Sequence, residues 1–431
     1  MAPSTLTPEE AAGRLHPTDT LGIPLGPGQP SAFLHALGGR DDWVDLTIGG
    51  ALLVDIYEVF LHPGVHHQSG FFGPAERFLI ASGADIQFIP ADFRRFAPVL
   101  ERTRPRVMST VAAAPDADGW CSLSLHAGAT VAELDRAAAD PDRVLLVEVN
   151  PGLPRTRGLG DHRHAVHVDQ ADILVESDRD PFVLDDVVPG PVAEQISTLV
   201  RPYVPDGATL QTGIGSIPSG VVGRLADGDG GDYGIHSEMF TTGLMHLHRS
   251  GKVTNARKGT YDGVSVTTFA AGTTELYEWL DENEEVCFLP VDVVNSPEAI
   301  ARNRNMVTVN GALLVDLYGQ VVADTLDGHQ FSGIGGHEDF VAASGLELED
   351  RSLICLPSTA EHEGVAHSRI VRHLPEGTVV TTPRHQLDLV VTEHGVAELR
   401  GATVRERARA LAAIADPSVR DELREAAEGF G

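Results

Sequence analysis

The sequence is poor in lysine and cysteine. Of its 431 residues, only Lys252 and Lys258 are lysines, and no GxxxxGK[ST] motif is present. Catalysis by a Schiff-base lysine or by a P-loop lysine is therefore nearly excluded. The three cysteines, Cys121, Cys287 and Cys355, lie far apart and form no CxxC pair, which argues against a disulfide scaffold and against a structural zinc site.

Positive charge and long apolar runs are also scarce. The chain has 62 Asp plus Glu against 32 Lys plus Arg, which gives a formal net charge of -30. Such a surface repels phosphodiester backbones and anionic lipid headgroups, so we expect no nucleic-acid partner and no membrane binding. No run of about 18 apolar residues is present, and the first residues show no basic segment followed by an apolar one. We therefore expect a soluble, cytoplasmic protein.

Short apolar runs alternate with segments of helical spacing along the whole chain. The runs at 144–149, 173–175, 352–356 and 387–391 predict buried strands flanked by turn residues. The segments 75–82, 193–201, 275–281 and 405–415 predict helices. Because this alternation is typical of βαβ units, the sequence predicts an α/β fold with largely parallel sheets.

A stretch at 184–191 that contains Pro and Gly marks the predicted joint between two domains, 1–187 and 188–431. Each half begins with an apolar strand, a glycine turn and a helix, at 20–31 and at 209–219. This similarity predicts two related α/β domains. The nearly identical segments 50–55 and 311–316 add to the similarity, although they are also ordinary strand sequence.

The segment Gly213-Ile214-Gly215-Ser216-Ile217-Pro218 is the first candidate ligand loop. Glycines after a strand let backbone N–H groups approach a phosphate, and the following helix N-terminus adds a favourable dipole. Pro218 suits the start of that helix, and Ser219 is a candidate cap. The third glycine of a dinucleotide-binding fingerprint is missing, so the segment is equally compatible with a ligand loop and with a simple turn.

Glu238 is the candidate catalytic carboxylate. It lies in the segment 234–243, directly after a short predicted strand, with no Lys or Arg within three positions. Ligands of open α/β sheets bind at the carboxyl ends of the strands. From this spacing, Glu238 is either a solvated carboxylate at a sheet edge or a residue held at a site.

Three glycines, Gly333, Gly335 and Gly336, occur within four residues of the segment 331–340. Such a segment disfavours the interior of a helix or strand. It predicts a concave run of backbone N–H groups that binds an oxyanion or a pantetheine group, or else a plain tight turn. Histidines gather at 62–67 and at 162–167, but no spaced carboxylate or cysteine completes either group, so we expect no metal site.

Taken together, these segments resemble the acetyl-CoA hydrolase/transferase family, whose members include enzymes like 4-hydroxybutyrate CoA-transferase and succinyl-CoA:acetate CoA-transferase. The resemblance extends from Asp19 to Glu422 and is densest in the second half. The matching segments, in order, are 148–150, 154–156, 213–217, 234–239, 252–255, 290–295, 331–336, 339–340, 357–360 and 391–395. A single match of this kind would be chance, whereas so many in order are specific.

The resemblance implies roles for individual residues. Glu238 corresponds to the catalytic nucleophile, and Asn295 to a residue beside the reacting carboxylate. Gly336 is implied to donate its N–H group to an oxyanion, and the first domain to supply a second donor near residues 50–52. Contacts with coenzyme A are implied for Gly213, Ile214, Gly215, Ser216, Ile217, Gly311, Ala312, Gly333, Gly335 and Gly336.

The family's architecture implies two related α/β domains of the NagB/RpiA/CoA-transferase type, assembled as homodimers or larger homo-oligomers. No resident cofactor is implied, because coenzyme A is a substrate that is held covalently in an intermediate. Two positions depart from the family pattern, since Glu361 stands where many relatives have a lysine and His394 where tyrosine is usual. We expect the positive charge for the CoA phosphates to come from Arg155, Arg257, Lys258 or Arg369.

The expected reaction is the transfer of CoA between an acyl-CoA and a free carboxylate by a ping-pong mechanism. It would pass through a glutamyl-CoA thioester on Glu238, in a dry cleft between the domains. The nearest alternative is an acyl-CoA (acetyl-CoA) hydrolase that uses the same glutamate, and the other is a sugar-phosphate isomerase or effector-binding module on a related fold. The acyl donor and the carboxylate acceptor stay open, and we expect residues 71–73 and 239–240 to shape the substrate pocket.

Overall fold

The computed structural model describes residues 4–345, 347–362 and 364–431. Its chain divides into two compact units. The first comprises the residues up to Asp185 together with Val266–Ser296, and the second comprises Asp186–Ser265 and Pro297–Gly431. The predicted joint at 187/188 lies close to the division at 185/186. The return of Val266–Ser296 to the first unit was not predicted, because it depends on pairing between segments far apart in sequence, such as Ala127 N–H with the Thr268 carbonyl at 2.8 Å.

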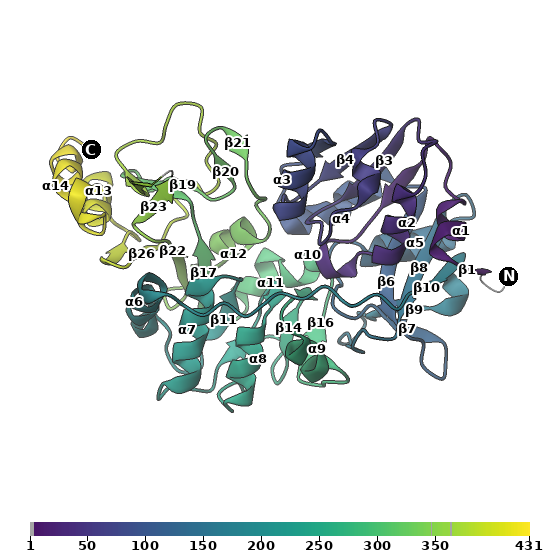
Figure 1. Ribbon diagram of the computed structural model, residues 1–431. Helices are drawn as coiled ribbons and strands as arrows, with labels where there is room; N and C mark the ends of the chain where they lie inside the picture. The colour runs from purple at the N-terminus through teal and green to yellow at the C-terminus, as the bar shows by residue number, and fades with distance from the viewer. Residues whose placement is uncertain (1–3, 346, 363) are drawn as a thin grey trace. The chain divides into compact units, whose positions relative to one another are not determined.

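The first unit is built on one eight-stranded parallel sheet (Figure 1). Its order is β1 (Ser4–Leu6), β10 (Ile173–Glu176), β8 (Val144–Asn150), β6 (Val107–Ala113), β2 (Thr20–Gly22), β3 (Leu46–Gly50), β4 (Val65–Ser69) and β5 (Asp85–Phe88). The chain proceeds from β2 outward to β5 on one side and from β6 outward to β10 on the other. The order of the strands therefore reverses between β2 and β6, the position where open α/β sheets bind ligands.

Helices cover both faces of this sheet. On one face, α1 (Pro8–Ala12) and α2 (Ser31–Gly38) enclose a core to which α2 contributes Phe33, Leu34 and Leu37, a spacing that puts all three on one side of the helix. On the other face, α5 (Val131–Ala139) packs against β6 and β8 through a second core that includes Leu134 and Ala137. The unit also contains α3 (Pro74–Ala81), η3 (Phe93–Arg95), α4 (Phe96–Thr103), α9 (Thr274–Leu280) and α10 (Val291–Val294).

The second unit has a six-stranded sheet that is parallel except for its last strand. The order is β12 (Gly234–Ile235), β11 (Thr209–Thr212), β17 (Met306–Gly311), β22 (Arg351–Cys355), β26 (Leu389–Thr392) and β27 (Gly395–Glu398). Its helices are α6 (Pro191–Val200), α7 (Ser216–Asp227), α8 (Thr242–Arg249), α11 (Pro297–Ala301), α12 (His337–Ala343), α13 (Val404–Ala413) and α14 (Pro417–Ala427).

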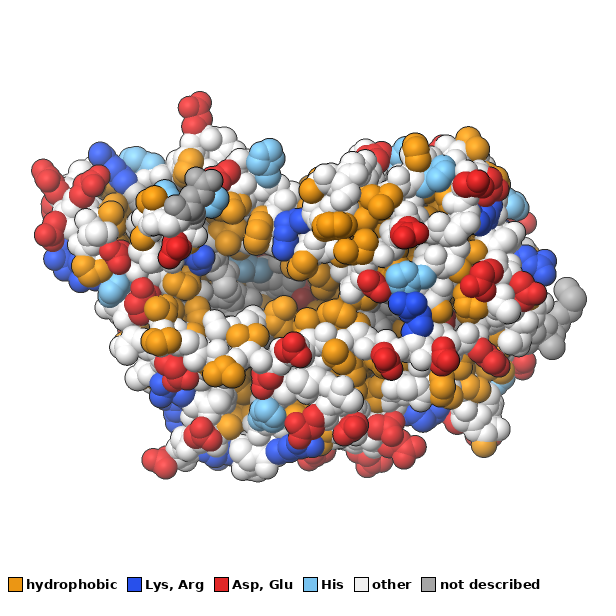
Figure 2. Space-filling model, viewed as in Figure 1, with side chains coloured by type: hydrophobic (Ala, Val, Ile, Leu, Met, Phe, Trp, Pro, Cys, Tyr) orange, Lys and Arg blue, Asp and Glu red, His pale blue; other side chains and the backbone are white. Residues whose placement is uncertain are grey.

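The predicted α/β class with largely parallel sheets is confirmed. The four predicted strands correspond to β8, β10, β22 and β26, and the four predicted helices to α3, α6, α9 and α13, each within a few residues. Acidic side chains are spread over the face shown in Figure 2, where Lys and Arg are fewer, as the net charge of -30 requires. Within the described ranges, no helix is long and apolar enough to cross a membrane.

Candidate active site

Glu238 follows β12, at the carboxyl end of that strand. The residues before it are tied to neighbouring segments: Ile235 N–H donates to Asn255 Oδ1 at 2.9 Å, and Ser237 Oγ donates to the Thr212 carbonyl at 3.1 Å. Ser237 is fully buried, whereas Glu238 is half-buried. The carboxylate is therefore carried by a fixed backbone and keeps access to a ligand, which favours a residue held at a site over one solvated at a free edge.

Lys258 also holds the backbone segment before Glu238 in place. Its side chain is fully buried, and Nζ donates to the carbonyl oxygens of Ile235 and Val264, each at 2.8 Å. A Cβ at Gly234 would lie 2.3 Å from Lys258 Cγ, so the glycine makes room for the lysine stem. The expectation that Lys258 contacts CoA phosphates is therefore wrong, because its ammonium group is used inside the unit.

Three other predicted cations differ in their surroundings. Arg155 donates to the Ala114 carbonyl at 2.6 Å and pairs with Asp116. Arg257 pairs with Asp232 at 2.5 Å. Arg369 is half-buried, and burial lowers the pKa of its guanidinium. Two of the three are thus already paired with carboxylates.

The candidate ligand loop joins β11 to α7. Helix α7 begins at Ser216 with Gly215 as its N-cap, so Pro218 and Ser219 lie inside the first turn and do not start or cap the helix as predicted. Gly215 has φ +113°, a conformation that side chains rarely adopt. A Cβ at Gly213 or Gly215 would meet nothing within 4 Å, and Ile214 is 59% exposed. The N–H groups at the start of α7 are therefore open to an anionic group.

Gly311 and Ala312 lie at the end of β17, the strand beside β11. Just before them, Asn310 and Gln211 exchange side-chain hydrogen bonds at 3.2 and 3.3 Å. The strand order reverses between β11 and β17, so this amide pair marks the position where ligands bind in open sheets. Sequence reasoning missed the pair, although each residue lies one place before the end of a largely buried strand, which was a usable signal.

Gly336 is the N-cap of α12, and Gly335 has φ +55°. Because α12 leads into β22, its N-terminus lies at the same edge of the sheet as the ends of the parallel strands. The helix start is anchored by His337, whose Nε2 lies 2.8 Å from Thr382 Oγ1, while that hydroxyl also bonds to Glu338. Burial lowers the pKa of His337 to about 4, so this imidazole is neutral at pH 7.

Two further segments that match the family, 357–360 and 391–395, are joined by hydrogen bonds to the carboxylate of Glu393. Glu393 accepts hydrogen bonds from Ser358 N–H at 2.8 Å and from Ser358 Oγ at 2.6 Å. The loops after β22 and β26 are thereby joined at the same sheet edge. The topology of the second unit thus brings Glu238 and the loops at 213–217, 311–312, 333–336 and 357–360 to one edge.

The predicted residues of the first unit are Asn295 and the segment 50–52. Asn295 is buried and caps the carboxyl end of α10, and Val291 at the start of that helix donates to the Gly128 carbonyl at 2.9 Å. Leu52 N–H donates to the Phe71 carbonyl at 2.9 Å, so it is not available to a substrate. Within the described part of the chain, Ala51 N–H has no hydrogen-bond partner, which makes Ala51 the candidate donor of this segment.

Groups of three or more His, Cys, Asp or Glu side chains that could hold a metal ion do not occur among the described residues. In the histidine groups at 62–67 and 162–167, His67 lies buried within β4 and His164 is buried as well.

Comparisons with known proteins identify the family to which the chain belongs. Residues 272–427 match the family model "Acetyl-CoA hydrolase/transferase C-terminal domain". The chain is 36% identical to succinyl-CoA:cyclohexane-1-carboxylate CoA transferase of Geobacter metallireducens, over 98% of this chain and 94% of that protein. It is 34% identical to 4-hydroxybutyrate coenzyme A transferase of Clostridium kluyveri, over 97% and 96%.

Solved structures give the same result. RipA from Yersinia pestis superposes with a TM-score of 0.90 at 33% identity and covers 99% of this chain and 97% of its own. The 4-hydroxybutyrate CoA-transferase of Porphyromonas gingivalis superposes with a TM-score of 0.78 at 29% identity, over 98% and 96%. The chain therefore belongs to the acetyl-CoA hydrolase/transferase family.

Proposed function

We propose that this enzyme transfers CoA between an acyl-CoA and a free carboxylate. Two CoA transferases that resemble it match along 97–98% of the chain and others along 66–82%, whereas an acetyl-CoA hydrolase of Yarrowia lipolytica matches over 50%. Full-length similarity therefore favours transfer over hydrolysis. Family membership also favours CoA chemistry over the sugar-phosphate alternative.

Glu238 is the proposed nucleophile. A carboxylate oxygen attacks the thioester carbonyl carbon, the C–S bond breaks, and a mixed anhydride and CoA thiolate form. The thiolate then attacks Cδ of Glu238, the anhydride C–O bond breaks, and the first acyl group leaves as a carboxylate. The glutamyl-CoA thioester remains.

The second half of the cycle repeats these steps in reverse. An incoming carboxylate attacks Cδ of the thioester and displaces CoA thiolate, which gives a new mixed anhydride. The thiolate attacks the carbonyl carbon of the new acyl group, so a new acyl-CoA leaves and Glu238 regains its carboxylate. No proton is gained or lost overall.

Backbone N–H groups are the proposed stabilisers of negative charge. Gly336 at the start of α12 offers one donor in the second unit, and Ala51 offers one in the first. A single donor to an oxyanion contributes about 3–4 kcal/mol to the transition state. Asn295 is proposed to orient the reacting carboxylate, and the loops at 213–217, 311–312 and 333–336 to hold CoA.

The observation that carries the proposal is the position of Glu238. It is half-buried at the carboxyl end of a parallel strand, on a backbone fixed by Lys258 and Ser237. The open glycine loop after β11 ends at the same edge. A carboxylate shielded from bulk water is a better nucleophile than a fully hydrated one.

The test compares CoA release with acyl exchange. Acetyl-CoA is incubated with and without propionate, while free thiol and propionyl-CoA are measured. We expect propionyl-CoA to form with little free thiol, Glu238→Ala to abolish exchange, and Glu278→Ala on the exposed side of α9 to leave it unchanged. Thiol release that ignores propionate would instead assign hydrolysis, and full exchange by Glu238→Ala would end the proposed mechanism.

A further inference from the structure

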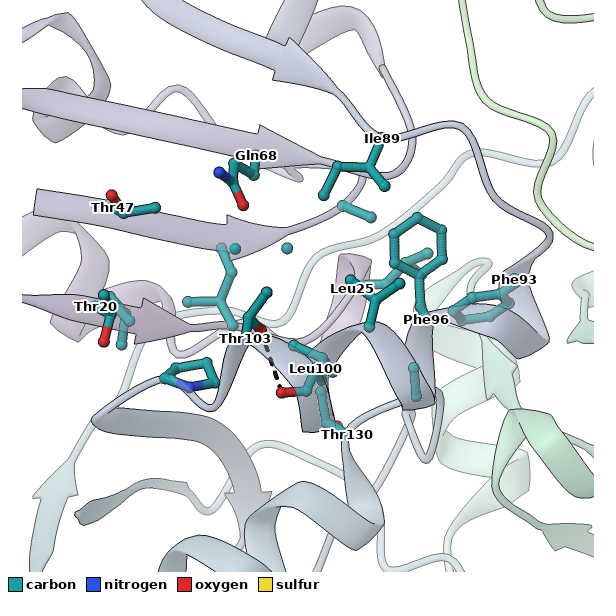
Figure 3. Close-up of a pocket in the computed structure, with 18 residues that line it drawn as sticks. Thr20, Leu25, Thr47, Gln68, Ile89, Phe93, Phe96, Leu100, Thr103 and Thr130 are labelled. Atoms are coloured by element: carbon teal, nitrogen blue, oxygen red, sulfur yellow. Dashed lines mark hydrogen bonds between the residues drawn. The ribbon is translucent and has the colours of Figure 1, made fainter. Parts of the chain in front are cut away.

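A cavity of about 80 Å³ lies inside the first unit, between the sheet and its cover (Figure 3). The floor is formed by the face of β2, β3 and β4 that carries Thr20, Thr47 and Gln68. The cover is formed by η3 and α4, and it contributes Phe96 and Leu100. All of the side chains that line the cavity are uncharged.

The empty space follows from one residue of β3. Leu46 and Ile48 point to the opposite face and are fully buried in the core under α2. Gly49, which is paired with Gln68 of β4, is half-buried on the cavity face, and a Cβ added there would meet nothing within 4 Å.

Neither the backbone nor the packing requires glycine at this position. The φ angle of Gly49 is not in the left-handed region, so a larger residue would cause no backbone strain. A side chain that filled the space would bury apolar surface and stabilise the unit. A cavity that could be filled at a gain in stability indicates space reserved for a ligand.

The cavity extends to the segments of the first unit that carry or adjoin the proposed catalytic groups Ala51 and Asn295. Gly50 and Ala51 line it, and Ala51 carries the candidate oxyanion donor. Ala129 and Thr130 also line it and follow Gly128, whose carbonyl accepts the N–H of Val291 at the start of α10. Asn295 caps the other end of that helix, and η3 packs against the same helix.

The lining and the volume define the chemistry of the ligand. A carboxylate placed in this uncharged cavity would lose its hydration and gain no cationic partner, only neutral hydroxyl and amide groups such as those of Thr20, Thr47 and Gln68. Engineered cavities of about 150 Å³ bind benzene, so a cavity half that size has room for about three carbon atoms.

We propose that this cavity binds the acyl chain of the substrate, and that the preferred chain is uncharged with three carbons beyond the carbonyl, as in a butyryl group. This inference rests on the proposed function, because it assigns a place to the acyl part of the thioester. Gly49 is then the residue that sets chain length, and the cavity is lined without the predicted specificity segments 71–73 and 239–240.

The test uses three thioesters with isotope-labelled acetate as the acceptor. Butyryl-CoA and succinyl-CoA share a four-carbon skeleton and differ in the terminal carboxylate, and acetyl-CoA lacks the chain. We expect kcat/KM for butyryl-CoA to be at least about 100-fold higher than kcat/KM for succinyl-CoA. We also expect kcat/KM for butyryl-CoA to be at least about 10-fold higher than kcat/KM for acetyl-CoA.

Gly49→Val fills the cavity. This variant is expected to lower kcat/KM for butyryl-CoA at least about 10-fold and to lower kcat/KM for acetyl-CoA less than about 3-fold. The matched control is Gly190→Val, at an exposed glycine that also has open space around its Cβ position; it should leave both values unchanged. Leu100→Ala enlarges the cavity and should raise kcat/KM for hexanoyl-CoA relative to butyryl-CoA, which keeps the proposal testable if Gly49→Val does not fold.

The outcomes separate the two proposals. Transfer that prefers succinyl-CoA, or that falls equally for acetyl-CoA and butyryl-CoA in Gly49→Val, overturns the cavity assignment and leaves the proposed function intact. Absence of transfer from every thioester overturns the proposed function instead. Calorimetry with the Glu238→Ala variant then tests the cavity assignment. The assignment is supported if Glu238→Ala binds butyryl-CoA more tightly than succinyl-CoA and if Glu238→Ala/Gly49→Val loses this preference. The assignment is overturned if the two variants bind butyryl-CoA with equal affinity.

Discussion

The ammonium group of Lys258 donates a 2.8 Å hydrogen bond to the carbonyl oxygen of Ile235, three residues before Glu238. The same group also donates to Val264, and the lysine is fully buried. One buried cation thus connects the strand that carries the candidate nucleophile to a neighbouring loop. The second lysine of the chain makes a similar contact elsewhere, since Lys252 Nζ donates to the carbonyls of Leu225 and Gly228 near the end of α7.

Replacing Lys258 with methionine should affect both stability and catalysis. Lys258→Met leaves two buried carbonyl oxygens without their donor, and hydrogen bonds to charged groups contribute about 1.5–3 kcal/mol each. We expect the free energy of unfolding to fall by about 3–6 kcal/mol. We also expect kcat to fall at least about 10-fold, because the backbone before Glu238 loses an anchor. Urea unfolding and steady-state kinetics measure the two effects.

Lys252→Met is the matched control for that experiment. It removes the same functional group from the carbonyls of Leu225 and Gly228 at the end of α7, and it keeps the backbone bond in which Tyr233 N–H donates to the Lys252 carbonyl at 2.8 Å. It should lower stability while kcat stays within about 2-fold of the wild type. Equal losses of kcat in the two variants would contradict the anchoring role of Lys258.

Gly215 provides a test of the CoA-binding loop. Gly215→Ala places a side chain at φ +113°, where strain of about 1–3 kcal/mol and a shift of the backbone N–H groups are expected. The KM for acyl-CoA should rise at least about 10-fold, with a smaller change in kcat. Gly190→Ala is the control, because Gly190 is the N-cap of α6 with ordinary φ -80° and similarly open space. An unchanged KM in Gly215→Ala would remove this loop from the CoA site.

The buried histidines predict a loss of stability in mild acid. Burial lowers the pKa of His126 to about 3, and among the described residues neither of its ring nitrogens has a hydrogen-bond partner. An unfolded histidine has a pKa near 6.5, so below that pH the unfolded state binds a proton that the folded state does not. The free energy of unfolding therefore falls as pH falls below 6.5, by about 1.4 kcal/mol per pH unit for each such histidine.

Replacing His126 with leucine isolates its share. Between pH 7.5 and pH 5, urea unfolding of His126→Leu should show a decrease in free energy that is about 2 kcal/mol smaller than that of the wild type. The exposed His329→Leu should keep the wild-type decrease. If the free energy of unfolding fell equally in the wild type and in His126→Leu between pH 7.5 and pH 5, His126 would have to take up its proton in the folded protein as it does in the unfolded chain.

Regular structure was predictable from the sequence wherever local pattern determines it. The runs at 144–149 and 387–391 became β8 and β26, because strands buried on both faces need unbroken apolar sequence. The start of α7 was misplaced by two residues, because Gly215 in a left-handed conformation ends the loop earlier than Pro218 suggested. A positive φ angle leaves little trace in sequence beyond the glycine itself.

The candidate site was predictable in part. Glu238 and the glycine loops carry recognisable sequence, and the parallel topology brings the loops of the second unit to one edge. The buried role of Lys258, the Gln211–Asn310 pair and the cavity at Gly49 depend on contacts between segments far apart in the chain. No spacing rule encodes such contacts, so only the folded structure reveals them.

The most direct measurement of the central claim is the intact mass of the protein after incubation with acyl-CoA. A covalent adduct equal to CoA minus one water should appear on the wild type, map to the peptide that contains Glu238, and disappear when acetate is added. Glu238→Ala should show no adduct. An unmodified wild-type mass during active turnover, or an adduct on another residue, would contradict the glutamyl-CoA mechanism.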